Sequence, residues 1–178
     1  MSSQAGRVKM ERLAPIAART AALDWDRIEE SLGELGYAKT PPLLRPAECA
    51  GLIGLYGDDS RFRTRIDMAR YRFGLGDYKY FAHPLPAIVE DLRRAAYPPL
   101  AAIANRWMET LGSRERYPAG LAEFLAFCHE RGQAKPTPLL LHYEAGGYNC
   151  LHQDLYGEVA FPFQLTCFLS RREQDYTG

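Results

Sequence analysis

The chain has 178 residues, of which 47% are hydrophobic and 25% are charged, values typical of one ordinary globular domain. Lys and Arg together number 22, as do Asp and Glu, so no net charge holds the whole chain to a polyanion or a membrane surface. These values argue against a disordered chain, a collagen-like repeat and a disulfide-dense mini-scaffold. The four cysteines show no close pairs, no segment resembles a signal peptide, and no apolar run reaches the ~18 residues of a membrane span. The sequence therefore predicts a reduced, cytoplasmic protein.

The first part of the chain is predicted to be mostly helical. Residues 1–20 are expected to form a flexible arm or a frayed helix. Asp24 is a typical N-cap for a helix that ends at Gly36, and Pro46 occupies the first position of a second short helix that ends at Gly57. Apolar residues at helical spacing predict two successive helices between Leu85 and Leu111, separated at Pro98-Pro99, and a further helix over Ala119–Arg131.

A basic stretch interrupts these helices. Residues 60–80 contain five Arg and one Lys against two Asp, which leaves a local charge of +4. Arg61, Arg63 and Arg65 alternate with apolar or small residues, so a strand would carry all three on one face. Two interpretations stay open for residues 61–72: a solvated strand edge that resists edge pairing, or a nucleic-acid contact in which arginines hold phosphates and nearby aromatic rings stack on bases. The aromatic residues in question are Tyr71, Phe73, Tyr78 and Tyr80.

The pattern changes after Pro136 and Pro138, which are expected to form a hinge. The runs LLLHYEAGGYNCLHQ and AFPFQLTCFLS are rich in bulky and aromatic residues and predict strands. The predicted fold class is therefore α+β, with helices followed by the opening strands of a sheet or barrel.

The residues best suited to chemistry are His152 and Asp154. On a strand, side chains two residues apart point to the same face. An imidazole beside a carboxylate supplies two of the three ligands of the 2-His-1-carboxylate site that holds non-haem Fe(II). The third ligand has to come from elsewhere, and the other histidines, at 83, 129 and 142, are more typical of structural or surface positions. The alternative for the pair itself is a hydrogen-bonded contact within a strand.

The surroundings of this pair resemble a known family. Tyr143 precedes His152 by nine residues and Gly146 precedes it by six, a pattern that resembles the first ligand strand of 2-oxoglutarate/Fe(II) dioxygenases. The string HYEAGGYNCLHQDLYGEVAFPFQLTCFLS, followed by DYTG, is similar to a bacterial 2OG-Fe(II) oxygenase family in a superfamily with AlkB-like and prolyl-hydroxylase-like members. The segments IDMARYRFGLGDYKYF and WDRIEESLGELGYAKTPPLL also look like that family, so the resemblance spans about residues 22–178.

The resemblance implies a double-stranded β-helix, or jelly roll, packed on N-terminal helices. One domain would cover residues 21–178, with helical support over 21–135 and the start of the jelly-roll core over 136–178. His152 and Asp154 would bind Fe(II), Tyr143 would contact the co-substrate 2-oxoglutarate, and O2 would hydroxylate a substrate C–H bond. Oxidative demethylation of alkylated nucleic acid is one such reaction. The candidate substrate contacts are Arg63, Arg65, Tyr148, Asn149 and Tyr156. For Tyr148, Asn149 and Tyr156, packing within the strands is an equally good explanation.

The sequence departs from the family pattern in one respect. In this family a second His follows the first pair by many residues, and a later Arg or Lys binds the far carboxylate of 2-oxoglutarate. No His follows His152 here, and Arg171 and Arg172 come too soon. The sequence therefore predicts a domain incomplete at its C-terminus and not competent alone. Two other functions remain as alternatives: a hydroxylase of a protein or small molecule, and an inactive fragment or binding module that uses the basic strand at 61–72. The substrate and the oligomeric state stay open.

Overall fold

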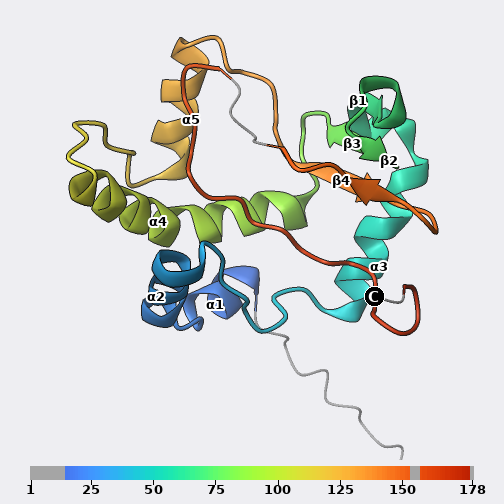
Figure 1. Ribbon diagram of the computed structural model, residues 1–178, viewed down its shortest axis with the longest axis horizontal. Helices are drawn as coiled ribbons and strands as arrows, with labels where there is room; N and C mark the ends of the chain where they lie inside the picture. Colours follow the sequence, from blue (N-terminus) through green and yellow to red (C-terminus); the bar gives the residue numbers. More distant parts are fainter. Residues whose placement is uncertain (1–14, 153–156, 177–178) are drawn as a thin grey trace, which may run out of the picture.

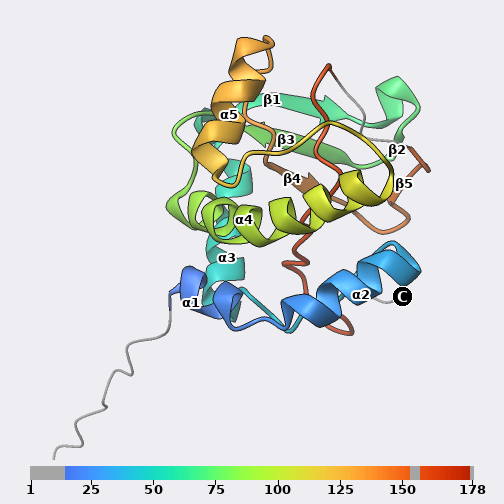
Figure 2. The ribbon, with the colours of Figure 1, turned by 90° about the vertical axis from the view of Figure 1, so that its left-hand side faces the viewer.

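The computed structural model describes residues 15–152 and 157–176 and shows an α+β fold, which confirms the predicted class. Helix α4 lies in the middle, with α1 and α2 on one side and α5 on the other, and the three-stranded sheet lies beside the N-terminal end of α4 (Figures 1 and 2). The helices are α1 (Ile16–Ala21), α2 (Trp25–Leu35), α3 (Pro46–Gly54), α4 (Ala87–Thr110) and α5 (Leu121–Glu130); the strands are β1 (Phe62–Asp67), β2 (Gly74–Leu75), β3 (Asp77–Phe81), β4 (Leu139–His142) and β5 (Tyr148–Asn149).

Helix α2 begins and ends where its sequence signals predict, whereas α3 begins where predicted but ends at Gly54 instead of Gly57. The Asp24 carboxylate accepts a hydrogen bond from the backbone N–H of Arg27 at 3.1 Å and so caps α2. Gly36 ends α2 in the left-handed conformation, with φ of 75°, where a side chain would be strained. Pro46 is the first residue of α3, which passes into a 3-10 turn over Leu55–Gly57.

Helix α1 begins inside the segment predicted as an N-terminal arm or frayed helix. It starts at Ile16 and ends at Ala21, and its Ile16 and Thr20 are buried, with exposed fractions of 6% and 1%. The chain is therefore packed from Ile16 onward, while residues 1–14 lie outside the described ranges. Ile16 belongs to a core cluster with Leu43, Leu44, Leu52 and Leu92.

Helix α4 corrects the prediction of two helices. It runs without a break through Pro98 and Pro99, although neither residue can donate the usual backbone hydrogen bond. Burial on both sides of the prolines explains why the helix continues, because Ala96 and Tyr97 before them and Ala101, Ile103 and Ala104 after them are all buried. Packing of this long face outweighs the two missing backbone bonds.

The main sheet has the order β1-β3-β4 and is antiparallel throughout. The central strand β3 buries Asp77, Lys79 and Phe81 on one face, while Tyr78 and Tyr80 on the other face are half-buried. A separate short pair joins β2 to β5, with Gly74 opposite Asn149 and Leu75 opposite Tyr148. Strands β1 and β3 precede residue 135, so the region predicted as helical support also supplies most of the sheet.

The run AFPFQLTCFLS forms no strand among the described residues, so that prediction is wrong. Residues 157–170 run beside α5 and across α4 toward α3 (Figure 1), and their rings pack on helices instead of pairing with another strand. Phe161 lies with its ring centroid 5.3 Å from that of Tyr97 and 5.5 Å from that of Phe124, and Phe163 packs on Trp107 at 4.7 Å. An extended run of alternating residues becomes a strand only when a neighbour completes the hydrogen-bond ladder.

Candidate functional site

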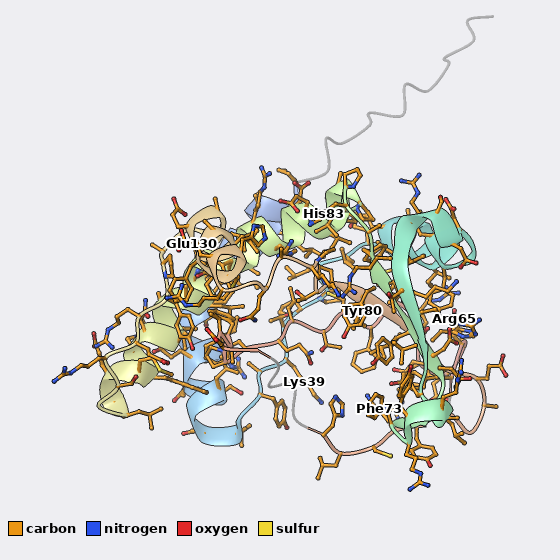
Figure 3. The ribbon with its side chains drawn as sticks, turned by 90° about the horizontal axis from the view of Figure 1, so that it is seen from above. Lys39, Arg65, Phe73, Tyr80, His83 and Glu130 are labelled. Atoms are coloured by element: carbon orange, nitrogen blue, oxygen red, sulfur yellow. The ribbon has the colours of Figure 1, made fainter. Side chains whose placement is uncertain are left out.

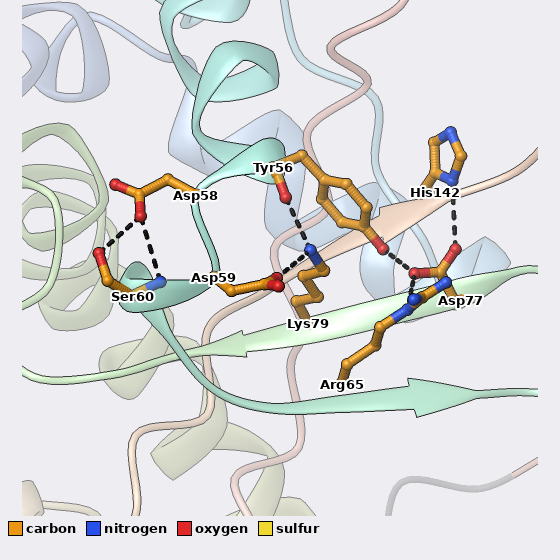
Figure 4. Close-up of polar contacts among 8 residues, drawn as sticks. All are labelled: Tyr56, Asp58, Asp59, Ser60, Arg65, Asp77, Lys79 and His142. Carbon is orange, nitrogen blue, oxygen red and sulfur yellow. Dashed lines mark hydrogen bonds and ion pairs between the residues drawn. The ribbon is translucent and has the colours of Figure 1, made fainter.

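A buried carboxylate organises the polar residues of the sheet. Asp77 is 8% exposed and accepts hydrogen bonds from the Tyr56 hydroxyl, from Arg65 Nε at 2.8 Å and from His142 Nδ1 at 3.2 Å (Figure 4). The register explains the contact with His142, because β3 and β4 place these two residues opposite each other. A chain segment from the middle of the sequence is thereby joined to the segment that leads to His152.

The hydrogen bonds fix the protonation of this cluster. Burial raises the pKa of the Asp77 carboxyl, but the hydrogen bonds from Tyr56, His142 and Arg65 outweigh burial, so its pKa lies below the ordinary value. Burial, together with the hydrogen bond to Asp77, raises the pKa of Tyr56 far above its ordinary value. Asp77 is therefore an anion and Tyr56 a neutral donor at neutral pH, and the ionised carboxylate accepts the Nδ1–H of His142.

Lys79 occupies the neighbouring position on the same face of β3. Its ammonium group donates to the Tyr56 carbonyl at 2.8 Å and to Asp59 Oδ1 at 2.7 Å (Figure 4), and it lies 4.5 Å from the centroid of the Tyr56 ring. A lysine that is only 7% exposed needs such partners, because burial removes the water from around its ammonium group. These contacts make Lys79 a structural residue of the sheet.

An open cleft of about 450 Å³ lies against the Asp77 cluster. Its walls combine ionisable side chains with a glycine-rich turn, so a ligand can approach both charged groups and backbone. The lining residues are Arg65, Asp67, Leu75, Gly76, Asp77, His142, Glu144, Ala145, Gly146 and Gly147.

His152 follows β5 and is exposed. Its Nδ1 lies 2.8 Å from the carbonyl oxygen of Cys150. A carbonyl only accepts, so Nδ1 carries the proton and, in the neutral ring, Nε2 carries the lone pair that binds a metal. Asp154 and Tyr156 lie outside the described residues, so the predicted HxD pair and the predicted contact of Tyr156 have no structural description.

Among the described residues, no group of three or more His, Cys, Asp or Glu side chains is arranged to hold a metal ion. His129 lies exposed in the last turn of α5, and His83 lies exposed before the cis peptide bond to Pro84. His142 faces Asp77. In the described part of the chain, none of these three joins His152 in such a group.

Tyr143 lies directly after β4 at the edge of the cleft. Its ring sits so close to Gly76 that a Cβ there would lie 2.8 Å from the ring atom Cδ1, and Gly76 has φ of +141°. Burial raises the pKa of the Tyr143 hydroxyl, and a hydrogen bond with Asn149 partly offsets this. Tyr143 and Asn149 thus lie together, and exposed Tyr148 precedes Asn149 in β5.

The predicted row of three arginines on one strand face is wrong. Arg61 belongs to the 3-10 turn Asp59–Arg61 before β1 and pairs with Asp58 at 3.3 Å. The register of β1 shifts between Phe62 and Thr64. As a result, Arg63 lies over the ring of Tyr80 at 4.3 Å, whereas Arg65 bonds Asp77 on the opposite face of β3.

Asp77, Tyr56 and Glu144 were not predicted from the sequence as site residues, and His142 was expected at a structural or surface position. The alternating burial of DYKYF was a weak signal for Asp77, because a charged residue on an otherwise buried strand face needs partners. The pairing with His142, 65 residues further along the chain, depends on strand register and leaves no local pattern.

Comparisons with known proteins bear on the same region. A family described as "Oxygenase, catalysing oxidative methylation of damaged DNA" matches residues 76–178, more than half of the chain. Two proteins of Mycobacterium tuberculosis are each 46% identical to this chain over 98 residues. They are Uncharacterized protein MT2286 (strain CDC 1551 / Oshkosh) and Uncharacterized protein Rv2227 (strain ATCC 25618 / H37Rv). The aligned part is 55% of this chain and 42% of each relative, so the chain spans less than half the length of these relatives.

No solved structure matches the chain significantly. None of the helices in the described ranges has the length and apolarity needed to cross a membrane. The matched region contains β3, β4, β5, the helices α4 and α5, and His152. The chain belongs to this family of oxygenases.

Proposed function

We propose that the protein is an Fe(II)- and 2-oxoglutarate-dependent dioxygenase that oxidises alkylated DNA. The description of its family, an oxygenase of damaged DNA, supports the reaction class and the substrate. The observation that carries the iron assignment is the contact between His152 Nδ1 and the Cys150 carbonyl, which fixes the ring tautomer in which Nε2 has the lone pair that metals bind. His152 therefore fits the donor set of a non-haem iron site, and Asp154, two residues later, is the proposed carboxylate ligand.

When bound, iron and 2-oxoglutarate supply the oxidation of a substrate C–H bond by O2, with 2-oxoglutarate converted to succinate and CO2. The chain's own residues position these molecules. Tyr143 keeps its proton at neutral pH, since its ordinary pKa lies well above 7 and burial raises it further, so its hydroxyl can donate to a carboxylate of the co-substrate. Gly76 leaves the space that the Tyr143 ring occupies.

The cleft beside Asp77 gives the substrate a place to lie. Arg65 and His142 reach Asp77 from the two neighbouring strands, so their positions are fixed before a ligand arrives. Tyr148 and Asn149 border the same region on β5. We assign these residues to substrate contact, with Arg65 able to bind a phosphate oxygen through its remaining guanidinium N–H groups.

We also propose a jelly-roll fold and a location in the cytoplasm. In the whole protein we expect the sheets β1-β3-β4 and β2-β5 to belong to a jelly roll. All four cysteines are free thiols, which suits the reducing cytoplasm.

The test is an anaerobic titration of the chain with Fe(II) and 2-oxoglutarate, followed by the metal-to-ligand charge-transfer absorption. If the chain is competent without a His after His152, the wild-type chain gives the band, His152→Ala loses it, and the matched control His129→Ala keeps it, because His129 lies exposed at the end of α5. A His152→Ala variant that keeps the band contradicts the iron assignment, and a folded wild-type chain without the band agrees with the expectation that these residues alone are not competent.

Turnover tests the substrate separately. In a chain that forms the band, we expect O2 and a single-stranded oligonucleotide that carries N-methylated bases to give succinate and formaldehyde in equal amounts. Succinate without formaldehyde indicates oxygenase chemistry on another substrate, such as a protein or a small molecule.

A further inference from the structure

The connection between β1 and β2 exposes a cluster of aromatic and basic side chains. We name residues 68–73 the tip loop. Tyr71 and Phe73 are 56% and 42% exposed, and their rings lie nearly parallel with centroids 5.6 Å apart. Arg70 and Arg72 alternate with them, both exposed, and no hydrogen bond or ion pair joins either guanidinium to another residue in the described ranges. Phe73 lies at the outer end of the β1–β3 hairpin (Figure 3).

Backbone hydrogen bonds hold the tip loop in this conformation. Met68 is fully buried, and its N–H donates to the Gly76 carbonyl at 3.0 Å. The Met68 carbonyl accepts from the N–H groups of Tyr71, at 3.2 Å, and Phe73, at 3.0 Å. Arg72 adopts the left-handed conformation with φ of 59°, which is uncommon for a residue other than glycine. The exposed rings are therefore presented by an ordered turn, which lowers the entropic cost of binding.

Two consecutive hydrogen bonds link the tip loop to His152. The Phe73 carbonyl accepts from the N–H of Cys150 at 2.7 Å, and the Cys150 carbonyl accepts from Nδ1 of His152 at 2.8 Å. A molecule that contacts Phe73 is therefore within reach of the proposed metal ligand.

We propose that the tip loop binds single-stranded DNA, with Tyr71 and Phe73 stacking on an unpaired base and Arg70 and Arg72 binding the adjoining phosphates. This inference rests on the proposed function for the choice of DNA, and it adds the loop beyond β1 to the phosphate contact proposed for Arg65. Exposed rings interleaved with arginines are the combination that binds unpaired bases and their backbone together. The bases of a duplex are stacked on each other and offer no free face to these rings, so the single strand is favoured.

The test is binding of a fluorescent, unmodified single-stranded DNA oligonucleotide, measured by anisotropy without iron or 2-oxoglutarate. We expect Tyr71→Ala and Phe73→Ala each to raise the dissociation constant about tenfold, and Tyr71→Phe and Phe73→Tyr to retain binding because they keep the ring. Arg70→Gln and Arg72→Gln should each flatten the dependence of log Kd on log salt by about 0.7. The matched controls Phe168→Ala and Arg114→Gln, which remove an exposed ring and an exposed arginine elsewhere, should leave binding unchanged.

The outcomes separate this inference from the proposed function. A wild-type chain that forms the iron complex but binds no single-stranded DNA overturns the inference and leaves the oxygenase. Binding that the tip-loop Ala variants do not weaken also overturns it, while DNA survives as the substrate. Equal or tighter binding of RNA or of a DNA duplex contradicts the assignment to single-stranded DNA. Circular dichroism of each variant confirms that a loss of binding comes from the side chain and not from unfolding.

Discussion

At the scale of single residues, Asp77 connects three segments of the chain. Its carboxylate accepts hydrogen bonds from Tyr56, Arg65 and His142, which lie on three different segments. We predict that Asp77→Asn lowers the free energy of unfolding by about 2 kcal/mol, since hydrogen bonds to a charged acceptor contribute more than neutral ones. Urea denaturation of the two proteins measures the difference. The matched control is Asp67→Asn, because Asp67 lies opposite Asp77 in the register but is exposed.

The pH dependence of this difference identifies its origin. The pKa of Asp77 is lower in the folded chain than in the unfolded chain, so its stabilising contribution is complete above the unfolded value of about 3.9. As the pH falls through the lower folded value, the carboxylate becomes protonated and the contribution is lost. The free energy of unfolding of the wild type should therefore exceed that of Asp77→Asn by the full amount at pH 6. This difference in free energy should disappear as the pH falls below about 4. A gap that is constant with pH would show that the carboxylate charge contributes nothing.

At the scale of elements, the two prolines of α4 remove two of the usual backbone hydrogen bonds of this helix, which lowers its stability. Pro98 and Pro99 cannot donate to the carbonyls of Arg94 and Ala95, four residues earlier in each case. Pro98 is exposed, so Pro98→Ala removes little packing and restores one donor. We predict a gain of about 1–2 kcal/mol in the free energy of unfolding, after allowance for the more flexible unfolded chain.

The matched control for this change is Pro86→Ala, at the N-cap of α4. No interior backbone bond is missing at Pro86, so the substitution should give no gain. Scanning calorimetry on the three proteins makes the comparison. If Pro98→Ala is no more stable than Pro86→Ala, the interior proline does not destabilise the helix.

The elements also show which features the sequence can predict. Local signals sufficed for α2, where Asp24 and Gly36 fix the two ends within a few residues of the chain. They failed for α4 because burial of the flanking turns, a tertiary effect, outweighs the local effect of Pro98-Pro99. In the candidate site, the motif that contains His152 was visible as a short pattern, whereas the contact between Asp77 and His142 was not, because it arises only when β3 and β4 pair.

At the scale of the whole molecule, residues 157–170 connect parts that are distant in the sequence. The backbone of Val159 makes two hydrogen bonds with the side chain of Gln133, at 2.8 and 2.9 Å, and Phe161 inserts among rings of α4 and α5. Further along, Cys167 and Leu169 pack against the core cluster that includes Leu52 of α3. One extended segment therefore contacts the helical layers at two separate places, and its alternating side chains pack although the segment has no strand partner among the described residues.

This arrangement predicts that the segment stabilises the molecule as a unit. Phe161→Ala should lower the free energy of unfolding by about 2–3 kcal/mol, because its half-buried ring contacts Tyr97, Tyr117 and Phe124. Phe168→Ala, which removes a ring that is 80% exposed, should change it by less than about 0.5 kcal/mol. Hydrogen exchange then distinguishes a local effect from a global one: if the segment joins the layers, Phe161→Ala accelerates exchange in α4 and α5 as well as in residues 157–170. Faster exchange confined to the segment itself would show that the helical layers are stable without it.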